Sequence, residues 1–339
     1  MKKLRVMMVV HYTLVPPEDL HDKNDQRMEK YRTEFDVKTA LLGLGHEVQV
    51  VGVYDDMAPI RKTIEEWKPH IAFNLLEDFA GNSAFDYYVV SYFEMMRLPY
   101  TGCNPRGLLL ARDKALTKMI LTYHRISVPD FTVFRRGRKI SHRRKFQYPL
   151  IVKSLMEEGS VGIAQASYVE NEQQLRERVE LIHTKLQGDA IAEQYIDGRE
   201  LYVTVLGNAK LEVLPFRELV FGNAEPGTPR MATYKVKWDE KYRERWAIEY
   251  QFARNLPNGM AERIGHLCKR VYHLLDMNGY GRIDLRLTPE NELYVLEANP
   301  NPGIATDEDC TLSATKAGMN YEDFIQRLLQ LGLTTRGGD

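Results

Sequence analysis

The sequence lacks long hydrophobic runs. Nowhere in its 339 residues does an apolar stretch approach the roughly 18 residues that a membrane-spanning helix requires. The charged and then apolar start, residues 1–10, has the order of a secretion signal, but its apolar part is too short and no small-residue cleavage site follows. We therefore predict that residues 4–10 form a first buried strand.

Cysteines are also few, and the positive and negative charges nearly cancel. The three cysteines, Cys103, Cys268 and Cys310, are scattered and odd in number, which argues against a disulfide framework or a zinc site and predicts a reducing cytoplasm. Lys plus Arg number 46 and Asp plus Glu 47, so the protein has no overall electrostatic field that favours binding to nucleic acid or to a membrane. The basic run at 135–145 has few aromatic side chains for base stacking, and we interpret it as a solvated connection. We expect a cytoplasmic protein that acts on small molecules and could form a homodimer.

Strand and helix patterns alternate in the first part of the chain. Strands are predicted at 4–10, 47–53 and 71–75, helices at 33–44 and 60–67, and a polar loop at 11–32. This alternation predicts a parallel α/β sheet, in which ligands bind beyond the carboxyl ends of the strands. The candidates for a substrate-facing rim are therefore His11, Tyr12, Tyr54, Asp55, Asp56, Asn74 and Glu77. The alternative is that each polar residue caps its strand.

Two alternating segments near the C-terminus, 279–287 and 292–303, predict a β-hairpin because turn residues separate them. If Leu287 lies opposite Tyr294, Asp284 faces Glu297 and Arg282 faces Asn299. Like charges directly opposite destabilise a hairpin, whereas two carboxylates and an amide suit Mg²⁺. The alternative is a hairpin edge with solvated acids.

A lysine beside a glycine-containing loop suggests phosphate binding. Lys153 ends the apolar strand predicted at 148–153, and the loop 157–162 contains Gly159, Ser160 and Gly162. Glycines let backbone N–H groups approach phosphate oxygens, and the ammonium group neutralises their charge. The loop alone is equally compatible with a hairpin turn.

These motifs, in this order, resemble the ATP-grasp superfamily, and specifically enzymes similar to D-alanine:D-alanine ligase. The resemblance covers about residues 99–331 and includes Asp113-Lys114 on a helix predicted at 108–124. It implies a parallel α/β N-terminal domain followed by two α+β subdomains that clamp ATP. The implied domains are 1–102, 103–192 and 193–339.

The resemblance also implies roles for particular residues. Arg282, Lys237 and Ser160 would act in catalysis, with Lys235 as a competitor for Lys237. The ATP contacts would come from Lys114, Lys153, Gly159, Gly162, Glu193, Tyr195, Ile196 and Glu200. Asp284, Glu297 and Asn299 would hold two Mg²⁺ ions, for which Mn²⁺ may substitute.

The implied reaction is ATP-dependent ligation of a carboxylate to an amine through an acyl phosphate, with release of ADP and phosphate. Alternatives are D-alanine:D-alanine ligase itself, a kinase that stops after phosphoryl transfer, and a non-catalytic ATP-binding protein. Nothing in the sequence identifies the two substrates.

The substrate segments depart from the family pattern. The Gly-Gly-x-Ser element is replaced by residues 11–19, and the segment after the metal asparagine by residues 300–309. Its acidic residues would repel a substrate carboxylate and attract an amine. We therefore predict substrates other than D-alanine, contacted by His11, Glu77, Asp307 and Asp309.

Overall fold

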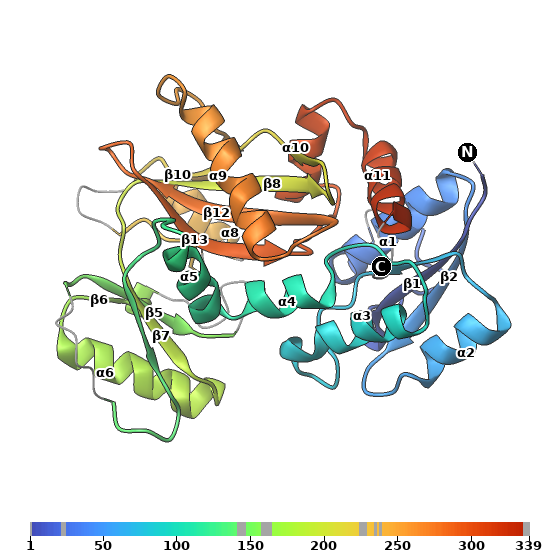
Figure 1. The fold of residues 1–339 in the computed structure, drawn as a ribbon, viewed down its shortest axis with the longest axis horizontal. Helices are drawn as coiled ribbons and strands as arrows, with labels where there is room; N and C mark the ends of the chain where they lie inside the picture. The colour runs from blue at the N-terminus through green and yellow to red at the C-terminus, as the bar shows by residue number, and fades with distance from the viewer. Residues whose placement is uncertain are drawn as a thin grey trace.

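The computed structural model describes residues 2–21, 25–140, 147–156, 165–223, 229–233, 236 and 239–334. Within these ranges the strands form three sheets. Figure 1 shows the N-terminal sheet (blue) on the right and the other two sheets on the left. Within the described residues, no helix is long and apolar enough to cross a membrane. Cys103, Cys268 and Cys310 are free and buried, so the prediction of no disulfide framework is confirmed.

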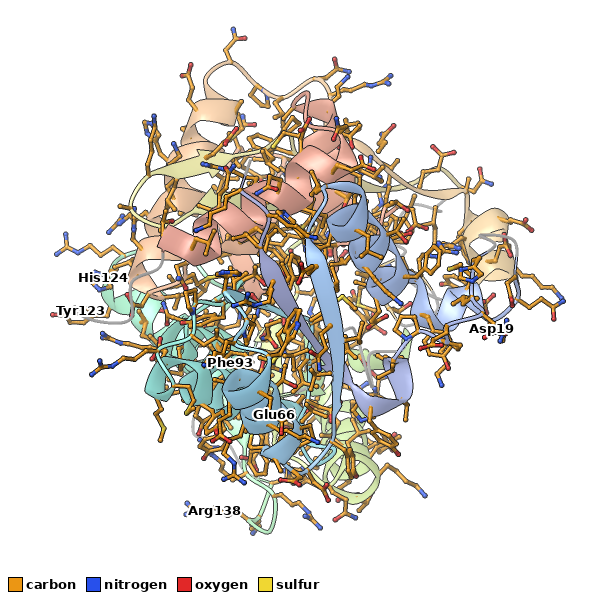
Figure 2. All side chains as sticks on the ribbon, turned by 90° about the vertical axis from the view of Figure 1, so that its right-hand side faces the viewer. Asp19, Glu66, Phe93, Tyr123, His124 and Arg138 are labelled. Carbon is orange, nitrogen blue, oxygen red and sulfur yellow. The ribbon has the colours of Figure 1, made fainter. Side chains whose placement is uncertain are left out.

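The N-terminal sheet is parallel, as predicted, with strand order β2-β1-β3. Its strands are β1 (Arg5–His11), β2 (Glu47–Val53) and β3 (Ile71–Asn74). The helices of this part are α1 (Met28–Gly43), α2 (Ala58–Glu66) and α3 (Asp86–Met95). The central strand β1 is apolar and buried from Val6 to Val10, because both of its faces are covered. Phe93 of α3, labelled in Figure 2, is completely buried.

The predicted loop at 11–32 is partly wrong. A 3-10 turn covers Tyr12–Leu14, and α1 begins at Met28, five residues before the predicted start. The first turn of α1 is mostly charged, so it shows no apolar periodicity, and only Met28 there is buried.

The single helix predicted at 108–124 is two helices, α4 (Pro105–Arg112) and α5 (Lys114–Tyr123). Asp113 separates them with an extended backbone, and its carboxylate accepts hydrogen bonds from the backbone N–H groups of Ala115 and Leu116, both at 2.9 Å. This is an N-cap, which starts a new helix. The C-terminal end of α5 reaches the edge of the molecule at Tyr123 and His124, and Tyr123 is 83% exposed (Figure 2).

The second sheet has four strands in the order β4-β7-β5-β6. They are β4 (Phe131–Phe134), β5 (Leu150–Ser154), β6 (Tyr168–Val169) and β7 (Ala190–Gln194), and apolar residues of helix α6 (Glu172–Leu181) share their core. The predicted domain boundary after residue 192 falls inside β7, whose residues through Gln194 pair with β5. We therefore propose that this boundary lies after Gln194.

The third sheet is antiparallel, with the path β11-β10-β8-β12-β13 and β9 beside β8. Its strands are β8 (Arg199–Gly207), β9 (Leu211–Val213), β10 (Arg217–Phe221), β11 (Ile248–Phe252), β12 (Tyr280–Leu287) and β13 (Leu293–Pro300). The associated helices are α8 (Glu240–Trp246), α9 (Met260–Leu274), α10 (Asp309–Lys316) and α11 (Tyr321–Thr334). Buried residues of α9 such as Cys268 and Tyr272 pack against Ile283 and Leu285. The sequence analysis missed α10, because Thr and Ser, weak helix formers, recur in it.

The hairpin register is confirmed in its first half and wrong near the turn. Asp284 pairs with Glu297 and Arg282 with Asn299, but Leu287 pairs with Leu293 instead of Tyr294. The register shifts because Leu296 is an additional residue between the partners of Asp284 and Leu285, which makes a β-bulge.

Candidate active site

A cleft lies between the second and third sheets. Strands β5, β7, β8, β12 and β13 all contribute to its wall. The lining residues are Pro129, Ile151, Lys153, Glu193, Gln194, Tyr195, Ile196, Glu200, Tyr202, Met231, Ala232, Asp284, Arg286, Leu296 and Glu297. Residues predicted separately from a strand, a linking segment and a hairpin therefore meet in one place.

Glu193 lies between two lysines in this cleft. Its Oε2 is 3.1 Å from Nζ of Lys153 on β5, and its Oε1 is 3.4 Å from Nζ of Lys118 on α5. Lys118 Nζ also donates a hydrogen bond to the carbonyl oxygen of Leu296 at 2.7 Å. All three charged side chains are buried, which strengthens the attraction of Glu193 for each lysine.

The two lysines respond differently to this environment. Burial lowers the pKa of Lys118 to about 8, against the opposing effect of Glu193 and with Lys153 adding to the decrease. Burial also acts to lower the pKa of Lys153, but the carboxylates of Glu193 and Glu297 outweigh it and the pKa is raised. Lys153 is therefore a permanent cation, whereas Lys118 approaches titration in the physiological range.

Asp284 and Glu297 face each other on the hairpin, and each has a cationic partner. Nε and Nη2 of Arg282 donate to the two oxygens of Asp284 at 2.7 and 3.0 Å, and Asn299 Nδ2 donates to Asp284 Oδ2 at 3.0 Å. Lys114, the first residue of α5, lies 3.0 Å from Glu297 Oε1. Although burial opposes it, Asp284 raises the pKa of Arg282 well above its ordinary value. The repulsion predicted between the facing carboxylates is thus offset by Arg282 and Lys114.

The bulge at Leu296 shapes this part of the cleft. It places Leu296 and Glu297 together on the cleft wall, while Val295 and Ala298 are buried on the opposite face of the strand. The Leu296 carbonyl that receives the Lys118 hydrogen bond belongs to the residue that the bulge adds to β13.

Glu200 is engaged on both oxygens. Arg286 Nη2 donates to its Oε2 at 2.7 Å, and the Tyr202 hydroxyl donates to its Oε1 at 2.8 Å. Arg286 also donates to the carbonyl oxygens of Gly198 and Arg230, both at 3.0 Å. Arg286 therefore ties the hairpin to the start of β8.

The oxygen donors of the hairpin fit a magnesium ion. Asp284, Glu297 and Asn299 offer carboxylate and amide oxygens from paired strands, and Mg²⁺ binds such ligands together with water and phosphate oxygens. Arg282 and Lys114 occupy these carboxylates, so their contacts would change on metal binding. For a nucleotide, Glu193 Oε1 is a buried acceptor whose contact with Lys118 Nζ is long, at 3.4 Å, so it can still accept a hydrogen bond from a ligand N–H group.

Comparisons with known proteins agree with this geometry. Residues 120–330 match the family model described as "D-ala D-ala ligase C-terminus". A D-alanine–D-alanine ligase from Syntrophotalea carbinolica is 30% identical over 306 residues, which cover 90% of this chain and 91% of that protein. The chain belongs to the D-alanine–D-alanine ligase family.

Solved structures give the same fold for this family member. The D-alanine–D-alanine ligase of Bacillus anthracis in complex with ATP superposes with a TM-score of 0.75 at 19% identity, covering 98% of both chains. The VanG D-Ala:D-Ser ligase of Enterococcus faecalis has a TM-score of 0.69 at 17% identity, covering 98% of this chain and all of that one. The predictions of an ATP-grasp fold and of an ATP-grasp ligase are confirmed.

Several residues predicted for this family member lie outside the described ranges. They are Gly159, Ser160, Gly162, Lys235 and Lys237. The other ATP and metal candidates line the cleft described above, except Lys114 and Asn299, which contact its residues Glu297 and Asp284.

The substrate candidates of this family member do not line the cleft; they lie in the segment after the hairpin, at the end of β1 and just beyond β3. Asp309 Oδ1 accepts a hydrogen bond from Arg217 Nε at 3.0 Å, and Asp307 forms an ion pair with Arg32. His11 packs edge to face against Tyr54, with ring centroids 5.6 Å apart. Glu77 is exposed just beyond β3. Each aspartate thus already has an arginine partner.

Two other residues of the predicted substrate-facing rim accept hydrogen bonds from nearby backbone N–H groups, as the alternative interpretation of these residues as caps predicted. Asn74 Oδ1 accepts from the backbone N–H of Leu76 at 3.3 Å, and Asp56 Oδ1 accepts from that of Ala58 at 2.8 Å.

The sequence analysis missed three charged residues that the structure brings to the cleft or next to its hairpin. Lys118 and Arg286 contact predicted site residues, and Glu34 of α1 lies near the loop that follows the hairpin. Lys118 is one helical turn after Lys114, a spacing that places both on one face of α5, and this was the available signal. For Glu34 the sequence contains no comparable signal, whereas Glu308 belongs to the acidic segment that the sequence analysis assigned to an amine.

Proposed function

We propose that this chain joins a carboxylate to an amine through an acyl phosphate, using ATP and Mg²⁺, with two metal ions, and releasing ADP and phosphate. The proposal extends to the substrates, which we infer are not two molecules of D-alanine. Family membership supports the ATP-dependent ligation. The rest depends on the residues of the cleft.

One observation supports the chemistry most directly: Lys114, Lys118 and Lys153 converge on the carboxylates that line a single cleft. A phosphoryl group in transfer carries dense negative charge, and catalysis of its transfer consists largely of positioning and charge neutralisation. Buried ammonium groups provide both, because their positions are fixed before the nucleotide arrives.

The carboxylates hold these cations in place until phosphate oxygens replace them. Glu193 orients Lys153 and Lys118, and Glu297 orients Lys114. Magnesium bound by Asp284, Glu297 and Asn299 would supply further charge neutralisation at the phosphates. Arg282, aligned by Asp284, would face the oxyanion at the acyl carbon.

In the second step the amine nitrogen forms the C–N bond. The C–O bond to phosphate breaks with its electron pair on the leaving phosphate, which also accepts the proton that nitrogen loses. A phosphate leaving group makes this step feasible, since a free carboxylate is a poor acyl donor.

The segment after Asn299 supports the proposal that the substrates are not two molecules of D-alanine. Residues 307–309 place three acids there, and burial raises the pKa of Glu308 to about 7 against the opposing effect of nearby Arg282. A substrate carboxylate would meet negative charge at this position. The alternatives remain D-alanine:D-alanine ligase itself and a non-catalytic ATP-binding protein.

The test is nucleotide product analysis with a panel of carboxylates and amines that includes D-alanine, amino acids, dipeptides and diamines. We expect ADP and phosphate only when both a carboxylate and an amine are present. AMP and pyrophosphate would overturn the mechanism, ADP formation with a carboxylate alone would indicate a kinase, and efficient D-alanyl-D-alanine synthesis would overturn the substrate part.

Asp284→Asn and its control Asp276→Asn complete the test. Asp276 is exposed and lies at the end of α9, where its left-handed backbone suits asparagine. We expect loss of turnover for Asp284→Asn and wild-type turnover for the control.

A further inference from the structure

One tyrosine on the wall of the cleft contacts two charged groups with different predicted roles. Tyr202 lies on β8 and lines the cleft. Its hydroxyl donates a hydrogen bond to Glu200 Oε1 at 2.8 Å, and the guanidinium carbon of Arg282 lies 5.0 Å from the centre of its ring. A single side chain therefore connects a predicted ATP contact with the arginine predicted to face the oxyanion.

The strand register brings these three side chains together. Glu200 and Tyr202 are two residues apart on β8 and share one face of the sheet. On the adjacent strand β12, Tyr202 pairs with Asp284, and Arg282 pairs with Thr204. Tyr202 is thus the diagonal neighbour of Arg282, a position within reach of long and aromatic side chains. The short side chain of Thr204 leaves the ring of Tyr202 as the large surface beside the arginine.

The ring of Tyr202 has a fixed place. The residue is only 3% exposed, and Leu219 and Ile248 share its apolar cluster. The ring of Tyr250 lies beside it, with centroids 5.8 Å apart. A guanidinium group within about 6 Å of an aromatic centroid is attracted to the ring, and removal from water strengthens this attraction. A buried and immobile ring can therefore hold Arg282 in one position.

This contact differs from the ion pair that Arg282 makes with Asp284. Both oxygens of Asp284 accept hydrogen bonds from Arg282, and the same oxygens are predicted to bind magnesium. When Asp284 serves the metal, Arg282 loses part of this support. The contact with the ring of Tyr202 uses no carboxylate oxygen, so it remains available in the loaded site.

The hydroxyl of Tyr202 acts on the other neighbour. Arg286 donates to one oxygen of Glu200 and Tyr202 to the other, so the rotation of this carboxylate is fixed. Each carboxylate oxygen has a second lone pair, which leaves both able to accept from a nucleotide. Burial raises the pKa of Tyr202 well above its ordinary value, with Glu200 adding to the increase. The hydroxyl therefore stays protonated and remains a donor.

We propose that Tyr202 is a positioning residue of the ligation reaction, whose hydroxyl orients Glu200 toward the nucleotide and whose ring holds Arg282 toward the reacting acyl group. This inference rests on the proposed function for the roles of Glu200 and Arg282. It adds that one side chain aligns both of them.

The role of the hydroxyl is tested by Tyr202→Phe, which keeps the ring and almost the whole volume of the side chain. Calorimetry with the full chain and Mg²⁺ should show ADP binding about two- to tenfold more weakly, the range expected for one lost hydrogen bond. Tyr250→Phe is the matched control, because it removes a hydroxyl from the adjacent ring, which does not line the cleft. Unchanged ADP affinity in Tyr202→Phe would overturn this role.

The role of the ring is tested by phenylalanines that carry one, two or three ring fluorines at position 202, compared with Tyr202→Phe. Fluorine withdraws electrons from the ring face and changes its shape little, so packing is kept while the attraction for a cation weakens. NMR of the Arg282 Nε–H group, with ADP and Mg²⁺ bound, measures its exchange with water. We expect exchange to become faster with each fluorine, by about two- to fivefold over the series. Equal exchange throughout would show that the ring only fills space.

Turnover separates this inference from the proposed function. ADP-forming ligation whose kcat falls along the fluorine series would support both. ADP-forming ligation with unchanged ADP affinity in Tyr202→Phe and unchanged Arg282 exchange would refute the positioning role and leave the ligase proposal intact. The expected changes in binding and exchange, without ADP release from any substrate pair, would refute the ligase proposal and leave the alignment of Glu200 and Arg282 by Tyr202 intact.

Discussion

Glu193 Oε2 and Lys153 Nζ are 3.1 Å apart in the interior of the cleft, where the side chains of both residues are almost completely buried. This pair links the second sheet internally, since Glu193 is on β7 and Lys153 on the adjacent β5. The other oxygen of Glu193 approaches Lys118 of α5. One carboxylate thus favours the charged form of both lysines.

Replacing Glu193 with glutamine should lower the pKa of Lys118 below its value of about 8, because the carboxylate that favours the ammonium form is removed while Lys153 remains. The measurement is an NMR titration of the lysine side chain in wild type and variant. Glu290→Gln, in the exposed hairpin turn, is the control and should leave the titration unchanged. An unaltered or higher pKa in Glu193→Gln would contradict the assigned pairing.

Glu297→Gln should destabilise the ligand-free protein by about 1 to 3 kcal/mol, because it deprives the buried ammonium group of Lys114 of its carboxylate partner. This outweighs the relief of repulsion with Asp284, which Arg282 already offsets. Chemical denaturation of the variant and of Glu290→Gln gives the comparison. Stability equal to that of the control would show that the Lys114 contact contributes nothing in the absence of ligand.

Glu34→Gln should stabilise the protein above pH 7 and have no such effect below about pH 4.5. The pKa of Glu34 is about 7 in the folded protein and 4.5 as its ordinary value, so the folded state binds more protons between these values. Stability from this group is therefore present below pH 4.5 and is lost as the pH rises to 7.

The gain at pH 8 should be on the order of 1 to 3 kcal/mol, since the rise in pKa from 4.5 to about 7 corresponds to roughly 3 kcal/mol at most. Urea unfolding at pH 4.5 and pH 8 measures it, with Glu29→Gln as the control. The other charged groups that influence the pKa values of Glu34 and Glu308 are Glu77, Asp307, Asp309 and Arg282. A variant that is less stable than wild type at pH 8 would indicate an undetected cation at Glu34.

Asp113→Ala should cost about 0.5 to 2 kcal/mol, the usual effect of removing an N-cap. The carboxylate of Asp113 satisfies two backbone N–H groups at the start of α5, and alanine leaves them without this partner. Asp113→Asn, which keeps the oxygen acceptor, is the matched control and should retain most of the stability. Equal losses in both variants would attribute the effect to charge instead of capping.

The sequence predicted the parallel sheet of the N-terminal part and the facing pair Asp284 and Glu297, because buried strands and alternating hairpins have strong local patterns. It missed the bulge at Leu296, since an additional residue in one strand leaves the composition of both strands unchanged. Side chains that depend on tertiary neighbours were also missed. Lys118 and Glu34 resemble ordinary solvated helix positions until β7 and the segment before α10 are placed beside them.

The helix break at Asp113 has a consequence for how this chain tolerates length changes. In a continuous helix, inserting one residue into α4 would rotate everything after it by about 100° and turn Lys114 and Lys118 away from the cleft. Because the Asp113 cap starts α5 afresh, the rotation of α5 is set by its own first turn and its own packing. Insertions in α4 can therefore be absorbed at this corner, and the two lysines keep their orientation toward the carboxylates of the cleft.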